Sequence, residues 1–325
     1  MVAIVMVCHK GDLELKTAFL IHTLRKYLKG NFRIYLGIPD EGRYTMPPSF
    51  EFLAYCKCFN IHIYNFNNPF LESKEQLLKG DLISNKIYAL IHPFEEETVL
   101  FLDSDIALLK DIDIAKIVGD TLTLALKPAG HAHVRNWELM YKAANLPMPV
   151  KKVLASVGQA EMPPYFNSGV MVFRKDFLGK FMETWVHYFL WLSDMDGKLS
   201  TEFPLFHRDQ ISLSLAICAC DADYSILDEL YNFPIRGKKI HKKSPPCLVH
   251  YHNTYSVYFE KLLEKEFLEF IKLHPFIMDS AGPLWKSLFE GSIIKRKSAV
   301  FIEYVRFNKY RLKRFLKTLK YRLFH

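Results

Sequence analysis

The sequence predicts an α/β fold in which a mixed, mostly parallel sheet is flanked by helices. Strand-like and helix-like segments alternate through the first half of the chain, which is the pattern of parallel sheets covered on both faces. The 325 residues are 50% hydrophobic and 14% aromatic, enough to bury the core of one large domain or two modest ones. A disordered protein is thereby excluded.

The predicted strands are short runs of aliphatic, β-branched and aromatic residues. They cover residues 2–7, 32–38, 60–66, 97–105, 121–126, 166–173 and 222–227. Helical periodicity is found in residues 13–28, 74–91, with a break or kink near Gly80, and 176–192. The segment 128–165, rich in Pro, His and Ala, is expected to be a long excursion from the sheet, and such loops commonly carry binding functions.

Targeting and redox signals are weak. The start, MVAIVMVCHK, is apolar for only eight residues and lacks a basic leader, so we expect a strand rather than a signal peptide. No run approaches the ~18 apolar residues that span a bilayer. The six cysteines have neither zinc-knuckle spacing nor the density of a disulfide scaffold, which favours reduced, mostly buried thiols in a cytoplasmic protein.

The net charge of +8 is unevenly distributed. The chain has 43 Lys and Arg against 35 Asp and Glu, but residues 291–325 alone hold eleven basic residues and one acid. Residues 1–290 therefore carry a net charge of −2. Because the basic character belongs to a terminal segment, the composition does not favour a nucleic-acid partner.

Two carboxylates, Asp103 and Asp105, follow the apolar strand in VLFLDSDIALLKDI (99–112). Side chains two residues apart on an extended chain point the same way, with backbones roughly 6–7 Å apart. In α/β sheets ligands bind at the carboxyl ends of strands, so both groups can reach one hard cation and, through it, a diphosphate. The alternative is a solvated strand end in which Asp105 or Asp111 caps a helix.

The carboxylate pair belongs to one of five short sequence stretches that together form a recognisable pattern. In order, they are SNKIYALIHPFEEETVLFLDSDIALLKDI (84–112), FNSGVMVF (166–173), HRDQISLSLA (207–216), LDELYNF (227–233) and LVHYHN (248–253). Together they resemble the sequence blocks of the retaining glycosyltransferases of family 8, which include glycogenin and bacterial lipopolysaccharide galactosyl- and glucosyltransferases. The resemblance covers roughly residues 1–255.

The resemblance implies the GT-A, or nucleotide-diphospho-sugar transferase, fold. It implies an enzyme that moves a hexose from a nucleotide sugar, usually a UDP-hexose, to a saccharide with retention of anomeric configuration. We therefore expect a catalytic domain over residues 1–255, a helical extension over 256–290 and a basic tail over 291–325.

A metal site is part of this expectation. The resemblance implies that Asp103, Asp105 and His250 bind Mn²⁺ or Mg²⁺ together with the donor phosphates. Two carboxylates and one imidazole suit Mn²⁺ better than Mg²⁺. The metal would neutralise the charge that develops on the departing nucleoside diphosphate.

The donor phosphates and sugar are expected to contact polar residues of two blocks. By resemblance, Lys86 lies near the phosphates and sugar, whereas a solvated helix lysine is the alternative. Asn167 and Ser168 would face the donor sugar, where Gly169 lets the backbone come close. Otherwise these residues form only the start of a strand.

Retention requires either a nucleophile beneath the sugar or front-face delivery of the acceptor. By resemblance, Gln210 lies near the anomeric carbon, but an amide is a poor nucleophile, so a covalent intermediate is not implied. Asp209 is expected to bind sugar hydroxyls. It also fits the N-cap of the helix that follows, and the two roles are compatible.

The sequence departs from the family pattern in two places. The nucleoside loop reads CHKGD (8–12), in which Cys8, His9 and Asp12, with Ser104, are expected to bind the nucleotide without selecting uracil. After its histidine the family has Gly and then Lys-Pro-Trp, whereas this chain continues HNTYSVYFEK. The basic stretch RGKKIHKK (236–243) either replaces the missing lysine or is a surface loop, so a weakened site is an alternative.

The excursion over 128–165 offers two minor candidates. His131 and His133 lack a third ligand, which favours exposed loop histidines over a second metal site. Trp137 is the better candidate for contact with the acceptor sugar, since aromatic faces pack on sugar CH groups.

Residues 295–325 are predicted to form a basic amphipathic helix with one apolar stripe. Such a helix binds an anionic membrane surface, each basic residue adding about 1 kcal/mol near the lipid. Family members that build surface glycolipids have similar tails, which suggests a lipid-linked acceptor and a cytoplasmic enzyme on the inner face of the membrane. The alternative is a helix packed on the protein itself.

Two other functions compete. An aspartyl-phosphate phosphohydrolase also places Asp-x-Asp after an apolar run, but there the pair usually follows the first strand. A non-catalytic, membrane-bound adaptor is the third possibility, because of the altered nucleotide loop and the missing lysine.

Overall fold

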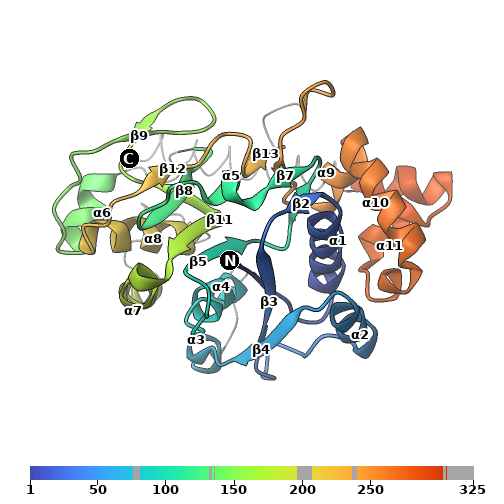
Figure 1. The fold of residues 1–325 in the computed structure, drawn as a ribbon, viewed down its shortest axis with the longest axis horizontal. Helices are drawn as coiled ribbons and strands as arrows, with labels where there is room; N and C mark the ends of the chain where they lie inside the picture. The colour runs from blue at the N-terminus through green and yellow to red at the C-terminus, as the bar shows by residue number, and fades with distance from the viewer. Residues whose placement is uncertain are drawn as a thin grey trace.

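The computed structural model describes residues 1–75, 81–131, 134, 136–195, 207–235, 240–302 and 305. Its centre is a seven-stranded sheet in the order β12-β8-β11-β5-β1-β3-β4 (Figure 1). The strands are β1 (Val2–Val7), β3 (Phe32–Pro39), β4 (His62–Phe66), β5 (Thr98–Leu102), β8 (Leu124–Pro128), β11 (Phe166–Arg174) and β12 (Ser225–Ile226). Only β11 runs antiparallel to its neighbours, β5 and β8, so the predicted mixed, mostly parallel sheet is confirmed.

Short strands form three smaller sheets. They are β2 (Leu28–Lys29) with β7 (Ile112–Asp113), β9 (Val153–Leu154) with β10 (Glu161–Met162), and β13 (Phe233–Pro234) with β14 (Leu248–His250) and β6 (Ile106–Leu108). The last of these matters for function, because β6 directly follows the Asp-x-Asp segment.

The helices pack on both faces of the sheet. They are α1 (Asp12–Tyr27), α2 (Phe50–Cys58), α3 (Pro69–Glu72), α4 (Asn85–Ala89), α5 (Ile114–Val118), α6 (Trp137–Ala143), α7 (Lys175–Asp194), α8 (Arg208–Ala219), α9 (Thr254–Phe259), α10 (Lys261–Leu273) and α11 (Pro283–Phe289). Two 3₁₀ helices, η1 (Asp81–Ser84) and η3 (Pro275–Asp279), precede α4 and α11. Within the described residues, no helix is both long and apolar enough to cross a bilayer.

The strands are apolar on both faces because each face meets helices. In β1, Ile4 and Met6 belong to one core cluster and Ala3 and Val5 to the other, as the period of two requires. The first cluster includes residues of α1, α10 and α11, and the second includes residues of α4, α7 and α8. This double cover explains why the strands read as continuous hydrophobic runs.

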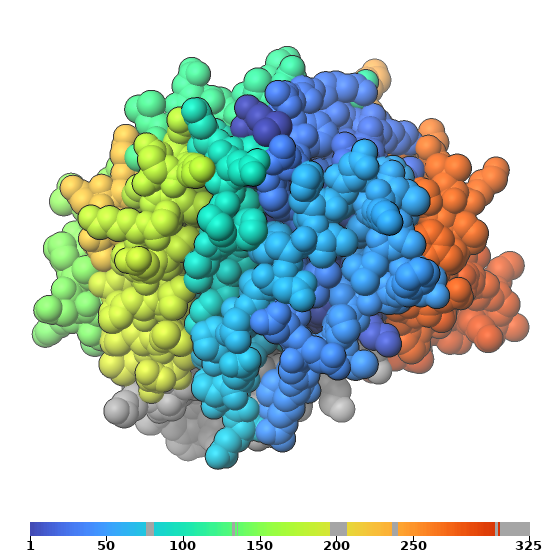
Figure 2. Space-filling model, turned by 60° about the horizontal axis from the view of Figure 1, so that its bottom comes forward, coloured from blue at the N-terminus to red at the C-terminus, as the bar shows by residue number. Residues whose placement is uncertain are grey.

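The helical extension predicted over 256–290 shares the first core cluster with the amino-terminal part of the chain. The Phe267 ring lies 5.2 Å from that of Phe19 and 4.8 Å from that of Trp285, measured between centroids. At the rim, Lys26 forms ion pairs of 2.8 and 2.7 Å with Glu266 and Glu269. Figure 2 shows the orange and red surface of the extension directly beside blue amino-terminal residues.

Substitution of Phe267 by Ala is expected to destabilise the whole protein. The side chain is fully buried, and removing a buried Phe costs about 3–5 kcal/mol through lost burial and the remaining cavity. Chemical denaturation followed by circular dichroism measures the change in free energy of unfolding. Leu268→Ala, at a neighbouring residue that is 44% exposed, is the control and should change stability far less. Equal effects of the two variants would show that the extension is not part of the cooperative core.

Some predicted elements differ from the structure. The helix predicted over 74–91 is represented by η1 and α4, and residues 76–80 lie outside the described residues. Helix α4 ends at Ala89, four residues before Pro93. The strand predicted over 222–227 is only two residues long, and the excursion over 128–165 contains α6 and the β9–β10 hairpin.

Candidate active site

The Asp-x-Asp segment lies at the carboxyl end of β5 and is fixed by its two neighbouring strands. The amide of Asp103 donates a 2.8 Å hydrogen bond to the carbonyl of Gly169. The hydroxyl of Ser104 donates a 2.9 Å bond to the carbonyl of Val7. The capping alternative is wrong for Asp105 and Asp111, because β6 follows Asp105 and the cap of α5 is the carboxylate of Asp113, bonded to the Ala115 amide.

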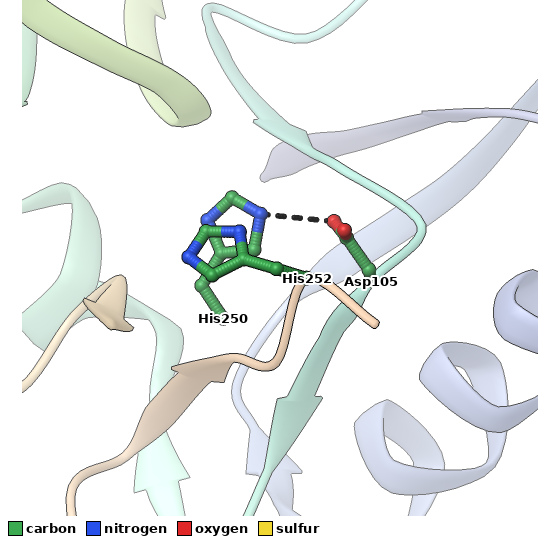
Figure 3. Close-up of side chains that lie close together, drawn as sticks. All are labelled: Asp105, His250 and His252. Atoms are coloured by element: carbon green, nitrogen blue, oxygen red, sulfur yellow. Dashed lines mark ion pairs between the residues drawn. The ribbon is translucent and has the colours of Figure 1, made fainter. Parts of the chain in front are cut away.

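His250 reaches this segment through sheet register. Strand β14 runs antiparallel to β6 and places His250 opposite Ile106, while the Tyr251 amide donates a 3.0 Å bond to the Asp105 carbonyl. His250 Nε2 consequently lies 2.9 Å from Asp105 Oδ1 (Figure 3). The structure therefore brings His250 beside Asp105, as the resemblance implies.

A second imidazole, that of His252, joins the pair. Its ring centroid lies 3.8 Å from that of His250, and one ligand atom each of Asp105, His250 and His252 lie within 4.8 Å of one another (Figure 3). His252 was not among the residues predicted for the site. The sequence shows a second histidine two residues after His250 in LVHYHN, but the period of two for extended backbone does not place it, because β14 ends at His250 and His252 has φ +59°.

Lys86, from α4, contacts the carboxylates of Asp103 and Asp209. Its Nζ lies 2.8 and 3.0 Å from the two carboxylate oxygens of Asp103 and 3.4 Å from Asp209 Oδ2. It also donates a 3.2 Å bond to the Ser168 hydroxyl. With only 11% of its side chain exposed, Lys86 is not the solvated helix lysine of the alternative interpretation.

Asp209 is buried beneath Lys86 rather than placed at the surface. Only 2% of it is exposed, and its Oδ2 accepts a hydrogen bond from the Ser168 hydroxyl. The N-cap interpretation is wrong, because α8 is preceded by His207 at the cap and Asp209 lies within the first turn. The next residue, Gln210, is half-buried, and the Trp185 indole anchors this turn by a 3.1 Å bond to the Asp209 carbonyl.

An amide network orients His250 from behind. Asn167 Oδ1 accepts bonds from the Gly169 amide at 2.9 Å and from Asn232 Nδ2 at 2.8 Å. Asn232 Oδ1 lies 2.9 Å from His250 Nδ1, which fixes the ring with Nε2 toward Asp105. Asn232 belongs to the LDELYNF block but was not among the residues predicted for the site.

Gly169 permits the close approach of His250 to β11. A Cβ atom at this position would lie 2.6 Å from His250 Cε1 and 2.8 Å from Asn167 Oδ1. Real side chains do not tolerate such contacts. The glycine is therefore required by the position of the imidazole, whereas the predicted close approach of the donor sugar to Gly169 stays a prediction.

The pKa values of Asp103 and Asp105 are shifted in opposite directions. Burial raises the pKa of Asp103, and the charge of Asp105 adds to this while Lys86 opposes it. Burial also acts to raise the pKa of Asp105, but the charge and hydrogen bond of His250 outweigh it and lower that pKa. Burial likewise acts against the Lys86 cation, yet the charges of Asp103 and Asp209 raise the lysine pKa. Asp103, Asp105 and Asp209 thus place three carboxylates near the single charge of Lys86, and this excess of negative charge makes the site attractive to a cation.

The predicted nucleotide loop is only partly accessible. Cys8 is fully buried in the core, where burial raises the pKa of its thiol, so its side chain faces away from solvent. The carboxylate of Asp12 accepts a 2.7 Å bond from the amide of Gly282, at the start of α11. His9 is half-buried, with Nδ1 3.0 Å from the Lys10 carbonyl. The fourth predicted nucleotide contact, Ser104, lies within the Asp-x-Asp segment itself.

Of the candidates in the 128–165 excursion, Trp137 does not form the exposed aromatic surface that was predicted. Trp137 is only 8% exposed and packs on Tyr165, 5.1 Å between ring centroids, so it is a core residue of α6 rather than an open sugar-binding surface. His131 is exposed, and His133 lies outside the described residues. Of the basic stretch, Lys242 and Lys243 are exposed and residues 236–239 are not described.

Solved structures of the galactosyltransferase LgtC share this fold. One in complex with donor and acceptor sugar analogues is 12% identical, with a TM-score of 0.52 over 84% of this chain and 95% of that chain. An active-site mutant of LgtC in which glutamate replaces glutamine is 12% identical, with a TM-score of 0.54 over 83% and 95%. The bifunctional glycosyltransferase WbbM, in its apo form, is 13% identical, with a TM-score of 0.50 over 86% of this chain and 51% of that one.

The fold is therefore the GT-A fold, and the protein is a glycosyltransferase. The Rhodobacterales glycosyltransferase domain matches residues 4–221, and the chain belongs to this family. No curated protein matches the sequence.

Proposed function

We propose that this protein is a metal-dependent, retaining hexosyltransferase that uses a nucleotide sugar, with UDP-hexose as the first candidate donor. The observation that carries the proposal is the meeting of Asp105 and His250, 2.9 Å apart, at the carboxyl end of β5. The Asp103–Lys86 ion pair lies next to them. Ligands of α/β folds bind at this edge of the sheet, outside the carboxyl ends of the strands.

The donor set fits a divalent cation. Carboxylate oxygens with imidazole nitrogen suit Mn²⁺, and Mg²⁺ to a lesser degree. Of the ligands expected by resemblance, Asp103, Asp105 and His250, the last two are in contact and are the proposed core of the metal site. When bound, the metal would neutralise charge on the leaving nucleoside diphosphate. Lys86 would add a fixed positive charge close to the same phosphates.

The buried residues have a positioning role in this proposal. Asp209 and Ser168, which are 2% and 1% exposed, hold Lys86 in place by an ion pair of 3.4 Å and a hydrogen bond of 3.2 Å. Asn167 and Gln210, which are half-buried, are the better candidates to face the donor. With an amide rather than a carboxylate nearest the proposed anomeric centre, front-face delivery of the acceptor is the favoured route to retention.

Thermal unfolding with a panel of nucleotide sugars tests the function. A matching donor at 100 times its Kd should stabilise the protein by about 2.7 kcal/mol. We expect this with Mn²⁺ present and not after chelation by EDTA, and we expect the stabilising donor to support transfer, with the product anomer assigned by NMR. Absence of any stabilising nucleotide sugar would instead support the adaptor alternative, and turnover of a phosphate monoester the phosphohydrolase.

We further propose that the carboxyl-terminal segment binds an anionic membrane surface and that the acceptor is a saccharide on a lipid. Residues 293–302 are helical and present exposed apolar side chains, among them Ile293, Ile294 and Phe301 at 71%, 77% and 66% exposure. The exposed Lys295 and Lys297 flank them, which is the composition of an interfacial helix. Residues 306–325 of the predicted tail lie outside the described residues.

Liposome flotation tests the membrane proposal. The full chain should float with vesicles containing anionic lipid, and a variant lacking residues 295–325 should not. Ile294→Ser with Phe301→Ser should weaken flotation in the full chain. Phe50→Ser, at a side chain that is 82% exposed on α2, is the matched control and should not. Equal flotation with and without the tail would refute membrane binding through this segment.

A further inference from the structure

We infer that His252 is a metal ligand of this site, so that Asp105, His250 and His252 form a face of one carboxylate and two imidazoles. The inference rests on the proposed metal dependence and deepens it. It differs from the ligand set expected from the sequence, which contains Asp103 and lacks His252.

The distances are close to those of a shared ion. His250 Nε2 and Asp105 Oδ1 are already 2.9 Å apart, and ligand atoms of all three residues lie within 4.8 Å of one another. Ligands that each bind one ion at about 2.1 Å are separated by about 3–3.5 Å. The 4.8 Å limit is somewhat longer than this separation, and the His252 side chain is half-buried beside the other two residues.

The backbone holds His252 in this position by an uncommon turn. His252 has φ +59°, in the left-handed region, and the Asn253 amide donates a 2.6 Å hydrogen bond to the Tyr251 carbonyl across it. Such a γ-turn with a left-handed central residue is rare and strained. On one side the Tyr251 amide is tied to Asp105, and on the other Asn253 caps α9 through a 3.0 Å bond from the Ser256 amide.

Asp103 is correspondingly less available to a metal. Both of its carboxylate oxygens face Lys86 Nζ, at 2.8 and 3.0 Å, so recruiting it would break a largely buried ion pair. Asp105 has no such lysine contact among the described residues and instead pairs with His250. The site thus separates into a Lys86–Asp103–Asp209 half and an Asp105–His250–His252 half.

The consequence is a change in metal preference. Imidazole nitrogen suits later first-row ions such as Co²⁺ and Zn²⁺, whereas Mg²⁺, Ca²⁺ and Mn²⁺ are better suited by oxygen ligands. A second imidazole therefore increases discrimination against Mg²⁺. His252 would set which ion the protein carries.

Titration of the metal-free full chain with Co²⁺ alone, followed by calorimetry and visible absorption, tests the inference. His252→Asn is the main variant, because Asn tolerates left-handed backbone, and His252→Ala is the second. We expect at least about a tenfold loss of Co²⁺ affinity and a changed Co²⁺ absorption spectrum, since perturbing even the outer shell of such sites costs about 10–100-fold. Mg²⁺ affinity should change much less.

His187→Ala removes an exposed imidazole on α7 and is the control, expected to bind Co²⁺ like the unmodified protein. Unchanged Co²⁺ affinity and spectrum in both His252 variants would overturn the inference, as would loss of binding in Asp103→Asn but not in His252→Asn. Because no nucleotide is present, these results are independent of transfer. If the unmodified protein transfers sugar but both His252 variants bind Co²⁺ with unaltered affinity, the proposed function stands and the inference about His252 is refuted.

Discussion

Gly169→Ala is expected to displace His250 and to reduce sugar transfer by at least about a hundredfold. The added Cβ would lie 2.6 Å from His250 Cε1, so the imidazole must move, and displacement of a positioned group by about 1 Å costs this much. Overpacking should also cost about 1–3 kcal/mol of stability. Transfer assays, Co²⁺ titration and chemical denaturation measure the three effects.

Gly179→Ala is the matched control for this variant. Gly179 lies within α7, and nothing is within 4 Å of the Cβ that the substitution adds. Ala is favoured over Gly inside a helix by about 1 kcal/mol, so this variant should be slightly more stable and fully active. If Gly169→Ala retained normal transfer and metal binding, the tight packing of His250 against β11 would have no functional importance.

Asp209→Asn is expected to abolish transfer while the fold stays intact. The substitution keeps the shape of the side chain and removes the charge that faces Lys86 at 3.4 Å. Lys86 retains its ion pair with Asp103, so no isolated charge remains buried, but the lysine loses one of the two carboxylates that position it. We expect a fall in turnover of at least about a hundredfold with an unchanged circular dichroism spectrum.

The first turn of α7 provides the control for Asp209→Asn. Asp176→Asn also neutralises an aspartate in the first turn of a helix, at an exposed position. Both substitutions remove a favourable charge from a helix amino terminus, so a loss of activity confined to Asp209→Asn isolates the effect on Lys86. Near-normal turnover of Asp209→Asn would remove this residue from the functional machinery.

Sequence patterns were sufficient for the architecture. Apolar runs alternating with amphipathic helices predicted a sheet covered on both faces, because a strand that is apolar at every position must be buried on both sides. The position of Asp103 and Asp105 followed from the same pattern, since the apolar run ends at Leu102 and polar residues begin there. These predictions depend only on local periodicity.

Predictions for single side chains were less successful where burial decided the outcome. Trp137 and Cys8 carry chemistry suited to ligand contact, yet both are buried in the core. Asp209 fitted a helix cap by its place in the sequence. The helix in fact begins at Arg208, and the Asp209 carboxylate faces Lys86. Which neighbours a side chain meets depends on packing between elements, which local sequence does not encode.

Local periodicity was enough to predict the α/β class and the carboxylate pair at the end of a central strand, and the resemblance to known blocks added His250 to that pair. The places of His252 and Asn232, and of Lys86 between Asp103 and Asp209, became apparent from the folded chain. The contacts of His252 arise from the antiparallel register of β14 on β6 and from a left-handed turn at that residue. Both depend on contacts between segments far apart in the chain, which periodicity along one segment does not reveal.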